Sequence, residues 1–190
     1  DSTFGAYAQR FTVAVPVIPA KVLTISVNNA AIQRSSVTES TIKFSQTVFL
    51  PANPADAFTL VGPTGTIQVT ATITSPSPQT TVRLTFSGPG TTAGSLDDGN
   101  YTLTAIAAQI GYGGLPLDGN GDGTGGDNKT VIFHRLFGDI DGDKTVAAND
   151  FIQFRLSLGG SNVAFDFDGD GAVAASDFLQ FRLRFGSSLP

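Results

Sequence analysis

The stretch DIDGDKTVAANDFIQFRLSLG, residues 139–159, returns at residues 166–186 as DFDGDGAVAASDFLQFRLRFG. Aligned without gaps, 14 of the 21 positions are identical. Each copy places aspartates at positions one, three, five and twelve of a loop that leads into an apolar segment. On a sharp turn, alternate carboxylates point toward one centre, which is the ligand spacing for a hard cation such as calcium. The duplication therefore predicts two calcium sites, each followed by a short helix.

The expected ligands are four aspartate side chains in each loop and the backbone carbonyl at position seven. In the first loop they are Asp139, Asp141, Asp143, the Thr145 carbonyl and Asp150. In the second loop they are Asp166, Asp168, Asp170, the Ala172 carbonyl and Asp177. Position six is normally glycine, because the turn there favours a backbone conformation that a Cβ atom opposes. Gly171 meets that requirement and Lys144 does not, so we expect strain in the first loop.

Apolar residues after each loop predict helices over residues 149–158 and 176–185, with Asn149 and Ser176 as N-caps. Two valines, Val146 and Val173, stand at position eight of the loops and are expected to pair with each other. The side chains expected on the inner helix faces are Phe151, Phe154, Leu158, Phe178, Phe181 and Phe185.

Composition limits the classes of protein to which the chain can belong. Its 190 residues are 41% hydrophobic and 14% charged, and they allow one domain of ordinary size plus a small one. No apolar run approaches the roughly 20 residues of a membrane helix. Of the sixteen acidic residues, thirteen lie between Asp97 and Asp177, and this charge disfavours nucleic-acid binding. The absence of methionine predicts a processed product or a piece of a longer chain.

The low charge, with abundant Thr, Ser, Gly and Val, is typical of secreted β-rich proteins, so we expect an extracellular or cell-surface location. Because the chain has no cysteine, disulfides are excluded. We expect bound calcium to stabilise the fold in their place.

Residues 21–137 predict an all-β domain, because short segments rich in Val, Thr, Ile and Phe alternate with turn residues. The expected strands lie within residues 21–28, 40–50 (as two strands), 57–62, 66–74, 81–88, 100–108 and 129–136. This spacing favours a two-sheet sandwich. Residues 1–20 predict an N-terminal strand from about Arg10 to Val15, followed by a linker that contains Pro16 and Pro19.

The segment LDDGNYTLTAI, residues 96–106, resembles the turn and strand of bacterial immunoglobulin-like domains. The resemblance implies that the Tyr101 hydroxyl bonds back to the backbone at a sandwich corner. The fold class expected is therefore a mainly β immunoglobulin-like sandwich followed by a small all-α calcium-loop pair in residues 138–190.

An aspartate at position twelve and a short first helix give the repeat pair its resemblance to a type I dockerin, a tandem module of EF-hand-like loops. The resemblance covers about residues 138–186. It implies a protein partner that binds to residues at the loop ends and along the helices. Carried onto this sequence, the partner-binding positions are Ala148, Asn149, Arg155, Ala175, Ser176 and Arg182. Alanine replaces the commoner hydroxyl at the first of these positions in both copies, and either a cohesin-like receptor or further copies of this chain are expected as partner.

A glycine-rich segment, LDGNGDGTGGDN at residues 117–128, carries a third set of oxygen ligands with similar spacing. These are Asp118, Asn120, Asp122, Thr124 and Asp127, whereas Lys129 stands at position twelve. Two interpretations stay open, a third calcium site and a flexible linker.

The single histidine, His134, lies in a predicted strand and is expected to be structural. Asn100 and Asn128 each begin an Asn-x-Thr triplet that can accept a glycan. Outside the three loops, the acidic residues are Asp1, Glu39, Asp56, Asp97 and Asp98. None of these forms a recognisable catalytic carboxylate pair, so we do not expect an enzyme.

The function expected is that of a non-catalytic, calcium-stabilised extracellular attachment protein. A first alternative is a self-assembling filament subunit, joined through strand addition by residues 11–17 or through head-to-tail docking. A second, from a different class, is a non-catalytic remnant or appendage of a secreted glycan hydrolase.

Overall fold

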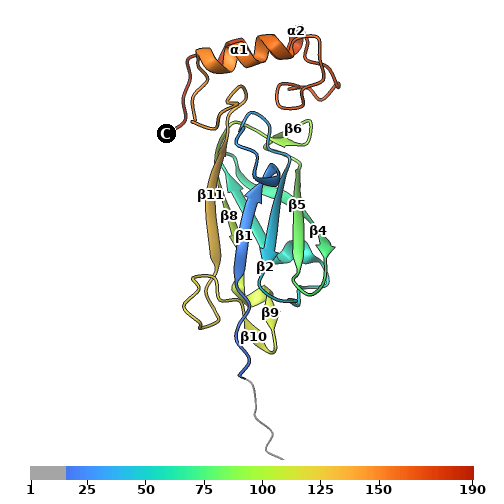
Figure 1. Ribbon diagram of the computed structural model, residues 1–190, viewed down its shortest axis with the longest axis vertical. Coiled ribbons are helices and arrows are strands. Elements are labelled where there is room, and N and C mark those ends of the chain that lie inside the picture. Colours follow the sequence, from blue (N-terminus) through green and yellow to red (C-terminus); the bar gives the residue numbers. More distant parts are fainter. Residues whose placement is uncertain (1–15) are drawn as a thin grey trace, which may run out of the picture.

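The computed structural model describes residues 16–190, and Figure 1 shows a β-sheet region with a pair of helices packed on one of its ends. Seven strands form the main sheet: β1 (Val22–Val27), β2 (Glu39–Phe44), β3 (Phe58–Gly62), β4 (Gly65–Ser75), β5 (Thr81–Ser87), β8 (Gly99–Ala105) and β11 (Lys129–Arg135). Two small hairpins add β6 (Thr91–Thr92) with β7 (Ser95–Leu96), and β9 (Gly111–Tyr112) with β10 (Leu115–Pro116). Single 3-10 turns are η1 (Asn28–Ala30), η2 (Pro54–Ala57) and η3 (Ala107–Gln109), and the helices are α1 (Ala148–Ser157) and α2 (Ala175–Arg184).

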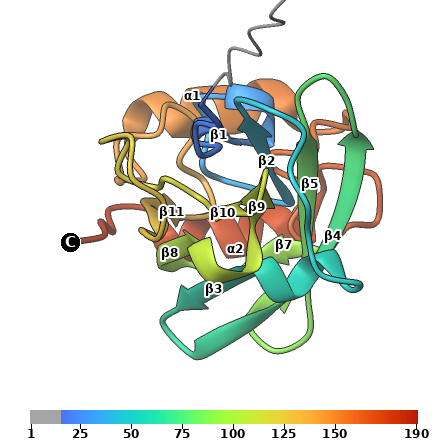
Figure 2. The ribbon, with the colours of Figure 1, turned by 90° about the horizontal axis from the view of Figure 1, so that it is seen from below.

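All pairings in the main sheet are antiparallel, in the order β1-β2-β5-β4-β3-β8-β11. The long strand β4 pairs with β3 over its first residues and with β5 from Gln68 onward, so it joins the two halves of the sheet. Viewed along the molecule, the strands form a nearly closed ring in which β1 and β11 are the two edges (Figure 2). The mainly β prediction is confirmed.

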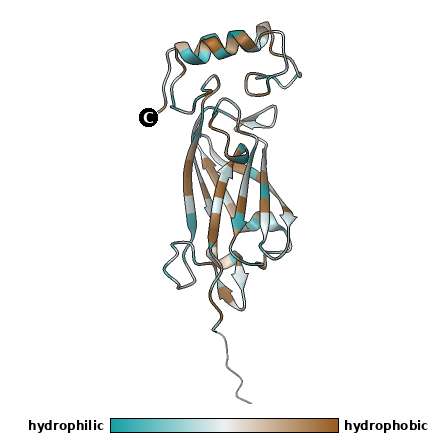
Figure 3. Cartoon of the chain, in the orientation of Figure 1, coloured by the Kyte–Doolittle hydropathy of each residue, from teal (hydrophilic) through white to brown (hydrophobic). Residues whose placement is uncertain are grey.

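Alternation along the strands explains why the sheet closes around one core. In β5, Val82, Leu84 and Phe86 are buried while Arg83 between them is exposed, and β8 buries Tyr101 and alternate residues in the same way. Figure 3 shows apolar and polar residues alternating along the strands. This period of two places one face of each strand inside the ring.

At the corner before β8, Tyr101 forms the hydrogen bond expected from the sequence. Its hydroxyl donates to the Asp97 carbonyl at 2.7 Å, and its ring stacks on Phe133 with centroids 5.8 Å apart. Gly62 packs against the ring so closely that an added Cβ would lie 2.3 Å from it.

The structure departs from the predicted strands after β2. Residues 40–50 form one strand, β2, and then only an isolated bridge between Phe49 and Gly111, so the second strand expected there was wrong. The chain turns away after β2, and the Val48 amide is satisfied by the Thr80 hydroxyl at 3.0 Å instead of by a neighbouring strand. The predicted strand at residues 10–15 lies outside the described residues, while Ala20 is buried in the sheet core.

A second core lies between the helices and the adjoining loops. Its aromatic centre includes Phe154 and Phe181, whose ring centroids are 4.7 Å apart. Leu136 and Phe137 belong to this core, although both precede the predicted boundary at residue 138. The reason is that both side chains lie beyond the end of β11 and pack under the helices instead of inside the sheet.

Both helices begin one residue before the predicted start, with Ala147 and Ala174 as N-caps. The caps predicted at Asn149 and Ser176 were therefore wrong. Because alanine has no side-chain acceptor, the carboxylates of the third helical residues bind the cap amides instead. Asp150 accepts from the Ala147 amide and Asp177 accepts from the Ala174 amide, both at 2.8 Å. This is the half of a capping box that an acidic third helical residue supplies.

The position-eight valines do not pair with each other as predicted. Val146 exchanges backbone hydrogen bonds with Gly186 and Ser187 after α2, and Val173 exchanges them with Gly159 and Gly160 after α1. Each loop is therefore bound to the segment that follows the helix of the other repeat. Residues 139–190 form one interlocked unit because neither repeat can satisfy these backbone groups alone.

Candidate metal centre

The two acidic loops share one pattern of internal hydrogen bonds. In the first loop, the Asp139 carboxylate accepts from the amides of Gly142, Asp143 and Lys144 at 2.6–3.2 Å. In the second loop, Asp166 accepts from the amides of Gly169, Asp170 and Gly171 at 2.8–3.1 Å. The first aspartate thus holds each loop in a tight turn that directs the later side chains toward one point.

Three carboxylates converge in each loop. One oxygen from each of Asp139, Asp141 and Asp143 lies within 4.8 Å of the other two, and the same holds for Asp166, Asp168 and Asp177. Two predicted ligands lie outside these triads: Asp150 accepts from the Ile140 and Ala147 amides, and Asp170 accepts from the Ala172 amide. At position seven, Thr145 and Ala172 each donate an amide to the position-five aspartate.

The charge of the first triad favours a cation. Desolvation raises the pKa of Asp141, and repulsion from Asp150 and Asp143 raises it further. A cation between the carboxylates relieves this repulsion. The donors are all oxygen, which matches a hard ion such as calcium and does not match metals that need thiolate or imidazole ligands. The residues therefore fit a hard metal cation.

No protein-family model, curated protein or solved structure matches this chain. In the described part of the chain, neither helix is long and apolar enough to cross a membrane.

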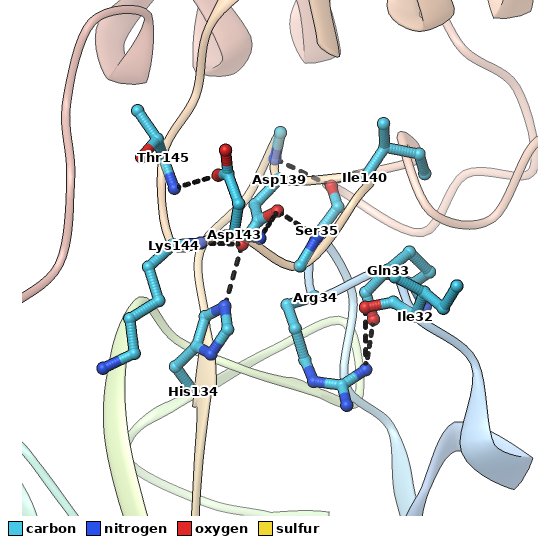
Figure 4. A network of polar contacts seen from close by, with 12 residues as sticks. Ile32, Gln33, Arg34, Ser35, His134, Asp139, Ile140, Asp143, Lys144 and Thr145 are labelled. Atoms are coloured by element: carbon cyan, nitrogen blue, oxygen red, sulfur yellow. Dashed lines mark hydrogen bonds and ion pairs between the residues drawn. The ribbon is translucent and has the colours of Figure 1, made fainter. Parts of the chain in front are cut away.

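The first loop is also bound to the sheet domain, as Figure 4 shows. The His134 ring, at the end of β11, lies with Nε2 2.8 Å from an Asp139 carboxylate oxygen. The Arg34 amide donates to the Asp139 carbonyl at 2.9 Å. Ser35 accepts from the Gly138 amide at 2.7 Å and donates to the Ala164 carbonyl at 2.5 Å. The prediction that His134 is structural did not anticipate this contact, although the histidine stands only five residues before the first ligand.

A second contact between the sheet domain and the helices is an ionic cluster. Asp98, just before β8, binds the guanidinium groups of Arg135 on β11, at 2.7 Å, and of Arg184 on α2. Both guanidinium groups also lie 5.0–5.7 Å from the ring centroids of Phe137 and Phe167. Burial lowers the pKa of Arg135, and Asp98 opposes that shift. Nothing in the local sequence pattern indicated this cluster.

The third loop reproduces part of the pattern. Asp118 is buried and accepts from the amides of Gly121, Asp122 and Gly123 at 2.6–3.2 Å, as Asp139 and Asp166 do in their loops. The Thr124 amide donates to Asp122 and lowers the pKa of that carboxyl group. Asp127 forms a backbone bridge with Asp118. Among the described residues, however, no triad of converging carboxylates lies here, so only the turn is shared.

The six positions predicted to bind a partner are all exposed: Ala148, Asn149, Arg155, Ala175, Ser176 and Arg182. The Asn149 side chain donates to Asp141 on the loop surface, and the Arg155 guanidinium lies 6.0 Å from the Phe151 ring centroid. Of the two glycan triplets, Asn128 is exposed, whereas the Asn100 side chain donates to the Pro190 carbonyl and its own oxygen is buried.

Proposed function

We propose that this chain is a non-catalytic, calcium-stabilised extracellular module, in which an immunoglobulin-like β domain presents a dockerin-like pair of calcium loops to a protein partner. The observation that carries the proposal is the pair of aspartate triads on duplicated loops with one hydrogen-bond pattern. Bound calcium supplies the positive charge that holds three carboxylates together. The Tyr101 corner and the antiparallel strand order support the immunoglobulin-like assignment.

The surface of the helix pair supports a protein partner. Both helices expose large apolar side chains to solvent, and Arg155 and Arg182 lie among them at equivalent positions of the two repeats. The exposed apolar residues are Ile152, Leu156, Leu158, Phe178, Leu179, Leu183 and Phe185. A surface that is rich in apolar groups and arginine is typical of protein interfaces. The partner proposed is a cohesin-like receptor or another copy of the chain.

Calorimetric titration of the purified chain with calcium tests the metal assignment. We expect two bound ions and a large rise in the thermal unfolding temperature, because binding to the folded state adds to its stability. The double variant Asp141→Ala/Asp168→Ala should lose both effects. Asp56→Ala is the control, since Asp56 is exposed and lies outside the loops. A wild-type chain that binds no calcium at millimolar concentrations overturns the proposal.

A filament subunit is the second candidate. Apolar side chains are exposed at both ends of the molecule, on the helices and at the β9–β10 end, where Phe49 and Leu115 line a cleft with Pro116. Head-to-tail contact between these ends would repeat without closing. Sedimentation with calcium and with chelator tests this arrangement: polymers that dissolve on chelation support it, and monomers in both conditions reject it. A deletion of residues 1–20 that leaves polymers intact rejects the strand-addition route.

The described carboxylates outside the three loops support a non-catalytic function. Asp98 is held by two arginines, Glu39 lies 3.6 Å from Arg83, and Asp97 accepts from the Thr92 hydroxyl. Glycoside hydrolysis needs two carboxyl groups that face each other across a cleft. Assay of the chain on polysaccharides should show no hydrolysis, and measurable turnover would favour the hydrolase-related alternative.

A further inference from the structure

The two loops differ in their surroundings although they share a sequence. Asp139, at the start of the first loop, is fully buried against the sheet domain. Its counterpart Asp166 is half-buried, and within the described part of the chain its carboxylate accepts only from amides of its own loop. Among residues 16–190, the first aspartate of the first loop therefore has a side-chain hydrogen bond from the sheet domain, and the first aspartate of the second loop has none.

The extra contact comes from one side chain. His134 Nε2 lies 2.8 Å from Asp139 Oδ2, and that oxygen also accepts from the Lys144 amide at 3.0 Å. Because a carboxylate can only accept, the histidine nitrogen is the donor. The other Asp139 oxygen, Oδ1, accepts from Gly142 and Asp143 within the loop. The ring thus fixes the rotation of the carboxylate from the side that faces the sheet.

The same loop has a weakness that this support offsets. Lys144 adopts φ = 72°, a left-handed conformation that a Cβ atom disfavours, whereas Gly171 takes up φ = 91° in the second loop without that penalty. Backbone contacts also brace the first loop: Gly142 lies so close to the Ile32 carbonyl that an added Cβ would be 2.4 Å from its oxygen.

We propose that His134 is a positioning residue for the first metal site. Through His134, the calcium affinity of this site depends on the sheet domain. By holding the Asp139 carboxylate toward the centre of its loop, it raises the calcium affinity of the first site and leaves the second unchanged. This inference rests on the calcium binding proposed above. Hydrogen-bond partners behind metal ligands typically change metal affinity about 10–100-fold when they are removed.

Calcium titration of the full chain in two backgrounds tests the proposal. Asp166→Ala/Asp168→Ala isolates the first site, and Asp141→Ala/Asp143→Ala isolates the second. His134→Phe keeps a ring of similar shape and removes the donor, while His134→Gln places an amide nitrogen near the position of Nε2. We expect His134→Phe to weaken the isolated first site about 10-fold or more. The isolated second site should be unchanged, and His134→Gln should recover most of the lost affinity.

Equal loss at both sites, or no loss at either, overturns the positioning role and leaves the proposed calcium binding standing. Failure of the wild-type chain to bind calcium overturns both. Circular dichroism shows whether His134→Phe keeps the sheet fold, and if it does not, His134→Leu replaces it in the same titrations. Unequal loss without rescue by His134→Gln also rejects the donor role, because a purely packing effect does not require the nitrogen.

Discussion

Tyr101 lies with its ring in the sheet core and its hydroxyl on the Asp97 carbonyl. Burial raises its pKa from 10.0 to about 12, and the nearby charges of Asp97 and Asp98 add to the shift. A pKa that is higher in the folded state means that the folded state holds the proton more tightly. The stability from this residue is therefore complete below pH 10 and is lost as the pH rises toward 12.

Comparison of the wild type with Tyr101→Phe isolates this effect, because phenylalanine cannot ionise. Urea unfolding should show the wild type losing stability relative to the variant between pH 10 and pH 12. A stability difference that stays constant over that range contradicts the expectation.

Position six of the loops gives a second prediction at the residue scale. Lys144→Gly should stabilise the calcium-loaded protein by about 1 kcal/mol, because glycine adopts positive φ without a Cβ penalty. Gly171→Ala should destabilise by a similar amount, since φ is 91° there while an added Cβ would meet no atom within 4 Å. Urea unfolding in excess calcium measures both, and a Lys144→Gly variant less stable than the wild type contradicts the first.

The helices depend on a few buried rings more than on their own propensity. Phe181 is 1% exposed and lies among Phe151, Phe154 and Phe165, whereas Phe185, one turn later, is 51% exposed. Phe181→Ala should destabilise the protein by about 3–5 kcal/mol because it removes a ring from a packed core. Phe185→Ala is the matched control and should cost much less. Equal effects in urea unfolding would show that the outer face is buried by self-association.

On the scale of the whole molecule, Asp98 links the sheet domain to α2 through Arg184 and also pairs with Arg135 inside the sheet domain. Asp98→Asn removes the carboxylate that pairs with Arg135, whose side chain is 2% exposed, and leaves that buried cation without its hydrogen-bonded counter-charge. We expect a loss of about 3–5 kcal/mol in the free energy of unfolding. Glu39→Gln, at the exposed Arg83 pair, is the control and should cost less than about 1 kcal/mol. Similar values for the two variants would show that the buried Asp98 cluster contributes no more to stability than an exposed ion pair.

Local spacing made the loops, most strands and both helices predictable from the chain. Aspartates at alternate positions define a turn within twelve residues, and a period of two defines a strand. The valine pairing was missed because it depends on which backbone groups meet after the repeats interlock, and that is a property of the folded pair. The caps are local, because Asp150 and Asp177 each accept from the amide three residues earlier.

The sequence by itself determined that two acidic turns precede two short helices after a β-rich region, because each of these features depends on neighbours in the chain. Only the tertiary structure decided that the first turn is bound to the sheet through His134 and Ser35. It also decided that Asp98 binds both Arg135 and Arg184, although Arg184 is 86 positions away from Asp98 in the chain. Such contacts depend on packing between distant segments, and burial then strengthens the interactions of charges that would be weak in water.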